Sequence, residues 1–333
     1  MRVKAYILSG ILLSISPIAY SQDLKNGGSF PFPPFPPIPL PKPDVTVNGN
    51  GDTNGGSQFG TITFQGNPTI FGDPNKSLIL TTSDKVTIHK ITNPAGKLGK
   101  GFSAELKADN ASEVVIENIH HQNYTGGSWI HVNVKNKLVV GNIRFGTDGI
   151  AGSQGHVELK STDGDVIVKD VSGCDWGCTG GLGIRPLNFL KIDGKNFYGG
   201  KIEAIGLPAV GSNSTLDLSG VKNTTFIDDL YMRSGTLYAK DFHFNNLTIW
   251  KGHTNRLDGG HPTAGSAYTA IDKNIGKSFI NNLSMEIGTS PTDSASLWFR
   301  QGGEILNINS VSYTHLTLPT TQLKCRSRWS PYH

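Results

Sequence analysis

The chain has 333 residues and a formal net charge of +4, but this charge is unevenly distributed. The segment from Met1 to Ser21 contributes Arg2 and Lys4 without an acid, and the segment 311–333 contributes three bases without an acid. Removing two and three positive charges from +4 leaves −1 for the remainder. Because phosphate binding needs a concentrated basic surface, the composition argues against a nucleic-acid partner.

The segment from Met1 to Ser21 is typical of a secretory signal peptide. Two basic residues are followed by an apolar run from Ala5 to Ile18, and Ala19 and Ser21 have the spacing that signal peptidase prefers. We predict cleavage between Ser21 and Gln22. An uncleaved membrane anchor is the alternative, but the run is shorter than a span of ~20 residues and contains three Ser and one Pro.

Residues 22–59 are predicted to form a Pro- and Gly-rich flexible spacer. Phe30 to Pro43 contains eight prolines in fourteen positions, which predicts an extended polyproline II segment. A docking site for a Pro-recognising domain is the alternative. Asn48 to Gly60 is rich in Gly, Asn and Asp and is interpreted as a flexible entry to the folded part.

A short phrase recurs from Lys85 onwards: two apolar residues separated by one polar residue, then a third apolar residue three positions later. Copies occur at 85–91, 113–119, 137–143, 165–171, 215–221 and 236–242, with a looser copy at 189–197. The first apolar residues of these copies are Val86, Val114, Leu138, Val166, Leu190, Leu216 and Leu237. The phrase thus returns about every 25 residues, and a period of this length indicates a repeat architecture.

Alternation with period 2 predicts strands with one buried face, and the Gly, Asn and Asp clusters between them predict turns. We therefore predict an all-β fold, a parallel β-helix (β-solenoid) over residues 60–310. About ten coils at a spacing of ~4.8 Å would give a length of ~50 Å. The alternative is an antiparallel sandwich or barrel, but hairpin signals are lacking and the repeat is longer than its usual strand spacing.

Two cysteines, Cys174 and Cys178, lie in the stretch CDWGC. In an oxidising envelope they could close a small ring, which the chain-entropy model values at ~2 kcal/mol. Free thiols or half of a metal site are the alternatives, although CxxxC is not a common zinc spacing. We interpret the pair as a candidate local disulfide.

Residues 311–333 differ in composition from everything before them, because they contain no Gly, Asp, Asn or Glu. The string VSYTHLTLPT at 311–320 resembles an out-of-frame translation of a sequencing adapter. We predict that the natural sequence stops near Ser310 and that 311–333 is a non-native tail, which includes the third cysteine, Cys325.

Several local sequence patterns suggest a catalytic or binding site, but none of them has the residues or the spacing that such a site needs. Gly276-Lys277-Ser278 lacks the upstream glycine of a phosphate loop. Adjacent Asp228 and Asp229 would face opposite ways on a strand, so a solvated turn is the preferred interpretation. The ten histidines show no metal-ligand spacing. We predict no catalytic residue, cofactor or metal site, although carboxylates gathered from neighbouring coils of a β-helix could still form a polysaccharide-active site.

The succession of coil sequences resembles the passenger of vacuolating cytotoxin autotransporters. The resemblance covers roughly Lys85 to Ser310 and is carried by STLDLSGV at 214–221, TLYAKDFHFNNLTIWKG at 236–252 and INNLSMEIGTS at 280–290, with earlier coils at 84–91, 112–119 and 188–197. It implies a right-handed parallel β-helix and a segment that contacts host cells and assembles with its own copies. It also implies export through a C-terminal β-barrel, and we interpret this chain as a fragment from which that barrel is missing.

From these features we expect a fragment of an exported passenger, secreted or displayed at the outer-membrane surface, that binds a host-cell receptor without enzymatic activity. The Pro-rich spacer stands where the toxin has its pore-forming segment, so a colonisation factor or adhesin is favoured over a pore-forming toxin subunit. A polysaccharide-active enzyme is the third hypothesis. No nucleic-acid partner is expected, and a homo-oligomer is implied by the resemblance alone.

Overall fold

The computed structural model describes most of the chain after the proline-rich segment. The described residues are 42–66, 75–93, 103–121, 128–145, 155–172, 188–205, 214–233, 235–249, 266–272, 277–286, 294–300 and 305–314. All of them lie in the compact unit that runs from Pro34 to His333. The predicted signal peptide and the spacer as far as residue 41 lie outside the described residues.

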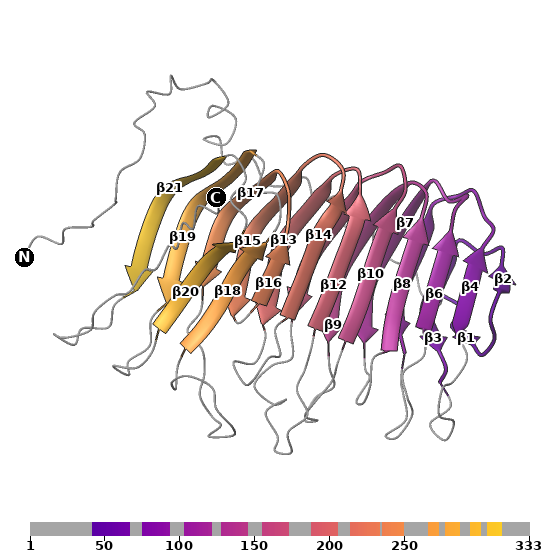
Figure 1. Cartoon of the computed structure of the whole chain (residues 1–333). Helices are drawn as coiled ribbons and strands as arrows, with labels where there is room; N and C mark the ends of the chain where they lie inside the picture. The colour runs from indigo at the N-terminus through magenta and orange to yellow at the C-terminus, as the bar shows by residue number, and fades with distance from the viewer. Residues whose placement is uncertain are drawn as a thin grey trace, which may run out of the picture. The chain divides into compact units, whose positions relative to one another are not determined.

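Within the described residues every regular element is a β-strand, and the strands form two parallel sheets (Figure 1). The eleven-stranded "odd sheet" contains β1 (Val45–Val47), β3 (Gln58–Phe64), β5 (Val86–Thr92), β7 (Glu113–His121), β9 (Lys137–Phe145), β11 (Val166–Ser172), β13 (Phe197–Ile205), β15 (Thr225–Arg233), β17 (Phe242–Ile249), β19 (Lys277–Glu286) and β21 (Ile305–Thr314). The ten-stranded "even sheet" contains β2 (Asp52–Asn54), β4 (Lys76–Leu80), β6 (Ser103–Ala108), β8 (Ser128–Val134), β10 (Gly155–Ser161), β12 (Asn188–Gly194), β14 (Ser214–Val221), β16 (Gly235–Tyr238), β18 (Ser266–Asp272) and β20 (Ser294–Arg300).

The chain alternates between the two sheets, so each coil adds one strand to each of them. In both sheets a strand pairs with the strands two positions before and after it in the chain, in the order β1-β3-β5 and β2-β4-β6 and onwards. The described pairings are parallel, as in β7 with β9 and β8 with β10. This is a β-solenoid, and the prediction of an all-β parallel β-helix is confirmed.

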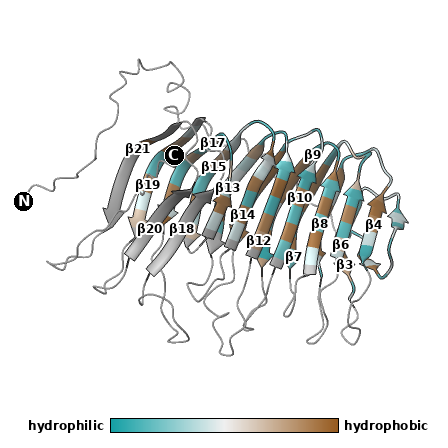
Figure 2. Cartoon of the chain, viewed as in Figure 1, coloured by the Kyte–Doolittle hydropathy of each residue, from teal (hydrophilic) through white to brown (hydrophobic). Residues whose placement is uncertain are grey.

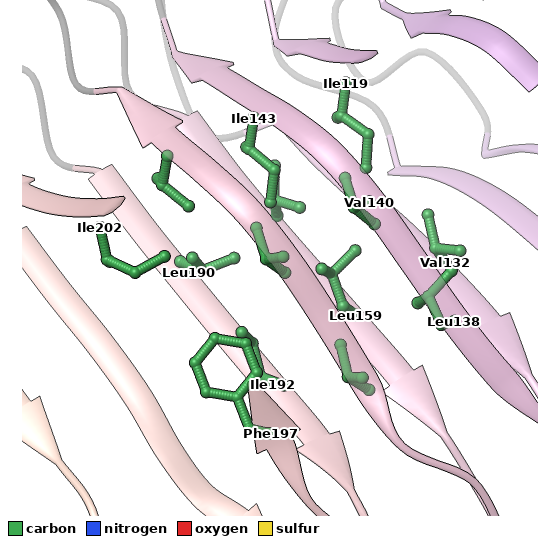
Figure 3. Packing of buried hydrophobic residues seen from close by; sticks show 14 of the residues in the cluster. Ile119, Val132, Leu138, Val140, Ile143, Leu159, Leu190, Ile192, Phe197 and Ile202 are labelled. Carbon is green, nitrogen blue, oxygen red and sulfur yellow. The ribbon is translucent and has the colours of Figure 1, made fainter. Parts of the chain in front are cut away.

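One hydrophobic core lies between the sheets and takes side chains from both (Figure 3). The register stacks equivalent side chains into continuous rows, such as Val114, Leu138 and Val166 along the odd sheet. The same residues are fully buried, which removes their apolar surface from water at about 25 cal/mol per Å². Core rows therefore stabilise neighbouring coils jointly, as expected of a repeat protein.

Strands of the even sheet show the simplest alternation. In β6 the burial pattern alternates at every residue, and Figure 2 shows apolar and polar bands alternating along the neighbouring strands β8, β10 and β12. Inward residues join the core, whereas outward residues remain partly exposed. Since parallel pairing keeps register, the outward residues also form rows that run across the coils.

The recurring phrase does not follow one sheet throughout. Val86, Val114, Leu138 and Val166 lie in the odd sheet, but Leu190, Leu216 and Leu237 lie in the even sheet. The prediction that Leu190 takes the place of Val166 in the next coil was therefore wrong. Val166 pairs with Phe197, and Leu190 pairs with Val157. The copy at 189–197 spans β12 and the first residue of β13, with a tight turn between them.

The solenoid begins earlier than the expected boundary at Gly60. β1 pairs with β3 in parallel, β2 pairs with β4, and Val47 is fully buried. The Asp44 carboxylate accepts a hydrogen bond of 2.6 Å from the Thr61 backbone N–H. Residues 45–54 therefore form the first coil, and β3 begins the second at Gln58. The sequence VTV supplies a short alternating strand, and the Gly and Asn residues supply its turn rather than a flexible linker.

At the other end of the described chain, β21 continues to Thr314 and crosses the predicted boundary at Ser310. Val311 pairs with Leu283, and Tyr313 pairs with Met285 in β19. The remaining residues of the predicted tail, 315–333, lie outside the described residues.

Candidate binding surface

The outward face of β6, β8, β10 and β12 carries an ordered set of aromatic and charged side chains. Three positions point outward from each strand, and the register stacks them into three rows. We call these twelve positions the outer patch. Its rows are Ser103, Trp129, His156 and Phe189; Glu105, His131, Glu158 and Lys191; and Lys107, Asn133, Lys160 and Asp193.

The first row brings three rings together. The centroids of Trp129 and His156 lie 4.3 Å apart, and those of His156 and Phe189 lie 5.6 Å apart. Trp129 also lies 5.9 Å from Phe189 although these residues belong to strands two positions apart in the sheet. Within one row, strands two positions apart are ~9.6 Å from each other, so the two large rings lean together over the imidazole.

His156 lies at the centre of this aromatic row and is held neutral. Its Nδ1 atom is buried and has no hydrogen-bond partner. Burial lowers the pKa of His156, and the neighbouring imidazole of His131 lowers that pKa further. A neutral ring packed between Trp129 and Phe189 extends the apolar surface instead of interrupting it with a charge.

The second row is charged and internally paired. The Glu158 carboxylate lies 2.6 Å from Lys191 Nζ through Oε1 and 2.9 Å from His131 Nδ1 through Oε2. Partial burial acts to raise the pKa of Glu158, but Lys191 and His131 outweigh it and hold that pKa below its usual value. The contact with Glu158 also raises the pKa of Lys191. Both groups therefore remain ionised at neutral pH.

The third row continues the pairing toward the edge of the patch. Lys191 Nζ lies 3.4 Å from Asp193, and Lys107 Nζ lies 3.5 Å from Glu105. The Asn133 amide donates a hydrogen bond of 2.7 Å to Glu105 Oε1. With histidines neutral, the three carboxylates and three ammonium groups of the outer patch balance, so its net charge is zero.

The odd sheet has an aromatic row of its own. Tyr198, Phe226, His243 and Phe279 stack in register across β13, β15, β17 and β19. The rings of Tyr198 and Phe226 are nearly parallel, at an interplanar angle of 5° and a centroid distance of 5.4 Å. Burial lowers the pKa of His243, while Asp241 opposes this change. The polar side chains beside this row are Asp and Asn residues joined by hydrogen bonds, and Lys201 of β13 forms an ion pair of 2.8 Å with Glu203.

Beside that second aromatic row, amide ladders follow the odd sheet. The Asn245 amide donates to Asp228 at 2.9 Å, and the Asn246 amide donates to Asp229 at 2.7 Å. The next coil repeats the arrangement with Asn281 on Asn245 and Asn282 on Asn246, at 3.0 and 2.9 Å. Asp228 and Asp229 therefore lie within β15, where each begins a separate ladder, and not in a solvated turn.

The sequence model of the vacuolating cytotoxin β-helical domain matches residues 40–318, which include every described residue. The chain belongs to this family. A vacuolating cytotoxin autotransporter from Helicobacter pylori is 36% identical over 104 residues, which are 31% of this chain and 7% of that relative. The chain thus matches only a small part of this relative's length. No solved structure matches the chain.

Membership of the vacuolating cytotoxin β-helical family agrees with the resemblance found in the coil sequences. The candidate residues Cys174, Cys178, Ser21 and Gln22 lie outside the described residues, so the disulfide and the cleavage site stay predictions. Among the residues that the structure describes, no group of three or more His, Cys, Asp or Glu side chains could hold a metal ion. A search of the same residues finds no helix of the length and hydropathy needed to cross a membrane.

Sequence inspection missed the outer patch of this vacuolating cytotoxin β-helical domain. Trp129, His156 and Phe189 come from three different coils, and only the strand register brings them into one row. The available signal was an aromatic or imidazole residue just before an inward apolar residue in three successive even strands, at WI, HV and FL. Aligning the even strands separately from the odd strands would have revealed it.

Proposed function

We propose that this chain is part of an autotransporter passenger, exported to the cell surface or released, that binds host-cell surfaces without enzymatic activity. The single observation that carries the proposal is the outer patch. It places aromatic rings and fixed charged groups on one outward sheet face, where they are partly exposed. Aromatic surface next to a few placed polar groups is typical of recognition sites.

The charge arrangement favours binding over hydrolysis. A glycoside hydrolase usually needs one carboxylic acid whose pKa is raised, so that it can protonate the leaving group. In the outer patch Glu158 has a lowered pKa and is paired with Lys191 and His131, and Glu105 is bonded to Asn133. Paired carboxylates hold their neighbours in place but are poor proton donors at neutral pH.

The family relationship supports the remainder of the proposal. The H. pylori relative is described as an autotransporter, and export of this passenger across the outer membrane is proposed by analogy. Self-assembly is also proposed on this basis. A host-cell receptor is the proposed partner, and the −1 net charge outside the two terminal segments argues against nucleic acid.

The proposal is tested by binding of the purified full chain, labelled with a fluorophore, to cultured epithelial cells. We expect saturable binding above that of an unrelated β-helical protein of similar size. Binding equal to that control would contradict the proposal. Conductance across planar lipid bilayers would instead favour a pore-forming toxin subunit, and release of reducing sugar ends from polysaccharides would favour an enzyme.

A further inference from the structure

We infer that the outer patch is a binding site for a neutral oligosaccharide, which stacks on Trp129 and Phe189 and hydrogen-bonds to the Glu158–Lys191 pair. This inference rests on the proposed function, because it names the chemical class of the surface that the passenger contacts.

The rings provide the platform. Trp129 and Phe189 converge to 5.9 Å over His156, which turns three separate side chains into one continuous apolar surface. All three are partly exposed, so this surface is available on the outer face. The C–H bonds of a pyranose ring form an apolar face, and such faces pack against aromatic rings. Trp129 offers the largest ring for that contact.

The second row provides hydrogen-bonding groups at a fixed distance from the rings. Glu158 and Lys191 lie two positions beyond His156 and Phe189 on the same strands, so they project from the same side of the sheet. A carboxylate has about four acceptor sites and Glu158 uses two of them in its contacts with Lys191 and His131. Sugar hydroxyl groups can donate to those that remain.

The pairing of these groups also lowers the entropic cost of binding. Lys191 contacts both Glu158 and Asp193, and Trp129 stacks on His131 at 5.5 Å with an interplanar angle of 3°. Side chains already fixed in the free protein lose little rotamer freedom when a ligand arrives. An ordered surface of this kind, with rings tilted by 30° to 60° relative to one another, suits a ligand with repeated, similar units.

Charge decides which class of oligosaccharide the patch accepts. Three carboxylates and three ammonium groups balance, and they are largely paired with one another. A sulfated or carboxylated glycan would need an excess of free basic groups, because each anionic group that loses water requires a new partner. Lys191 is shared by Glu158 and Asp193, so Lys160 is the one ammonium group of the outer patch without a carboxylate partner. One such group is too few for a densely sulfated or carboxylated glycan, and the outer patch therefore matches an uncharged glycan.

The aromatic row of the odd sheet supplies a matched control. Tyr198 and Phe226 stack with their faces against each other, and the polar side chains beside them are already joined in the Asp228–Asn245–Asn281 ladder. Phe226→Ala removes one outward aromatic ring of similar exposure from the opposite sheet. It should leave oligosaccharide binding unchanged.

The test uses the full chain and its Trp129→Ala, Phe189→Ala and Phe226→Ala variants against immobilised cellohexaose, chitohexaose and milk-type neutral tetrasaccharides. Heparin hexasaccharide and sialylated tetrasaccharides are the anionic probes. We expect binding to at least one neutral probe, weaker by about tenfold or more in the first two variants and unchanged in the third. Circular dichroism and thermal midpoints confirm that each variant is folded.

Three results would overturn the inference: binding to none of the glycans, binding to anionic probes alone, or equal neutral-glycan binding by Trp129→Ala and the parent chain. The cell-binding assay separates this failure from failure of the proposed function. If the parent chain and Trp129→Ala bind cells equally well, the passenger proposal stands while the oligosaccharide site does not. If the parent chain binds neutral glycans but not cells, the host-binding proposal fails.

Discussion

The two sheets of this solenoid use their outward polar residues differently. In the odd sheet, adjacent polar residues such as Asn245 and Asn246 bond along the stack, each to its counterpart in the next coil. Across β6 to β12 of the even sheet, outward residues instead pair in small ion clusters beside the aromatic rings. The odd sheet has a comparable ion cluster nearer its start, where Glu113 lies 2.7 Å from Lys85 and 3.1 Å from Lys137, but its aromatic row lies beside the amide ladders. The comparison separates polar residues that hold the coils together from residues that are available to a partner.

The tight turns that join the even sheet to the odd sheet are the most sensitive points of both. A Cβ atom added at Gly164 would lie 2.6 Å from the carbonyl carbon of Asn136 and 2.7 Å from the nitrogen of Lys137. These are backbone atoms of the preceding turn, so they cannot rotate away. On the other side, the Gly164 carbonyl accepts a hydrogen bond of 2.8 Å from the Lys195 backbone.

We therefore expect Gly164→Ala to destabilise the stack by more than about 2 kcal/mol, measured as a lowered denaturant midpoint of the full chain. Gly55→Ala is the control, because its added Cβ would meet only Thr81 Oγ1, at 3.7 Å. The control should be neutral or slightly stabilising. Equal midpoints for the two variants would show that the turns are not closely packed.

The sequence predicted the fold correctly, but it did not show that the recurring phrase changes from the odd sheet to the even sheet after Val166. The reason is that strands of the two sheets have similar local patterns. Both kinds of strand begin with two inward apolar residues separated by one outward residue. In the odd sheet the third apolar residue, such as Ile119, lies in the same strand, whereas after Leu237 it is Phe242, which begins the next strand. Local spacing alone does not distinguish a bent strand from a strand followed by a turn.

Sequence reasoning missed the outer patch for a related physical reason. Coil length varies widely: a short coil separates Thr225 from its partner Phe242, whereas a much longer one separates His243 from its partner Phe279. Rows on the surface depend on which residues pair, and pairing depends on how much chain each coil places outside the sheets. An error in the assumed pairing does not affect the predicted core rows, because many of their positions are Val, Ile or Leu. The same error would prevent the prediction of a row made of three specific rings.

The second prediction compares one amide from each sheet. Asn246 donates to Asp229 and accepts from Asn282, so Asn246→Ala removes two hydrogen bonds and interrupts a ladder. The Asn133 amide donates to Glu105 on the even face, where it is part of no such ladder. We expect a loss of about 1–2 kcal/mol for Asn246→Ala and of about 0.5 kcal/mol for Asn133→Ala.

Denaturant midpoints of the two variants, measured under identical conditions, check this difference. Midpoints are preferred to extrapolated free energies because long repeat arrays need not unfold in one cooperative step. If Asn133→Ala proves as costly as Asn246→Ala, the even sheet also depends on its polar rows for stability. The distinction between a structural face and a binding face would then fail.

The smallest expected effect concerns pH and the histidines in the two aromatic rows. Burial lowers the pKa values of both His156 and His243 below the ordinary 6.5. The unfolded chain therefore takes up a proton first, so stability falls as pH drops below about 6.5 and stops falling once the folded-state pKa is passed. His131 deepens the effect at His156, whereas Asp241 opposes it at His243.

We expect His156→Phe to reduce the loss of stability between pH 7 and pH 5 more than His243→Phe does, at constant ionic strength. Each change should be well below the limit of about 1.4 kcal/mol per pH unit for one proton, because both rings are partly exposed to water. Denaturant midpoints at the two pH values measure it. A larger change in His243→Phe would mean that His243 is more enclosed by its neighbours than His156 is. The aromatic row of the outer patch would then be less rigid than we infer.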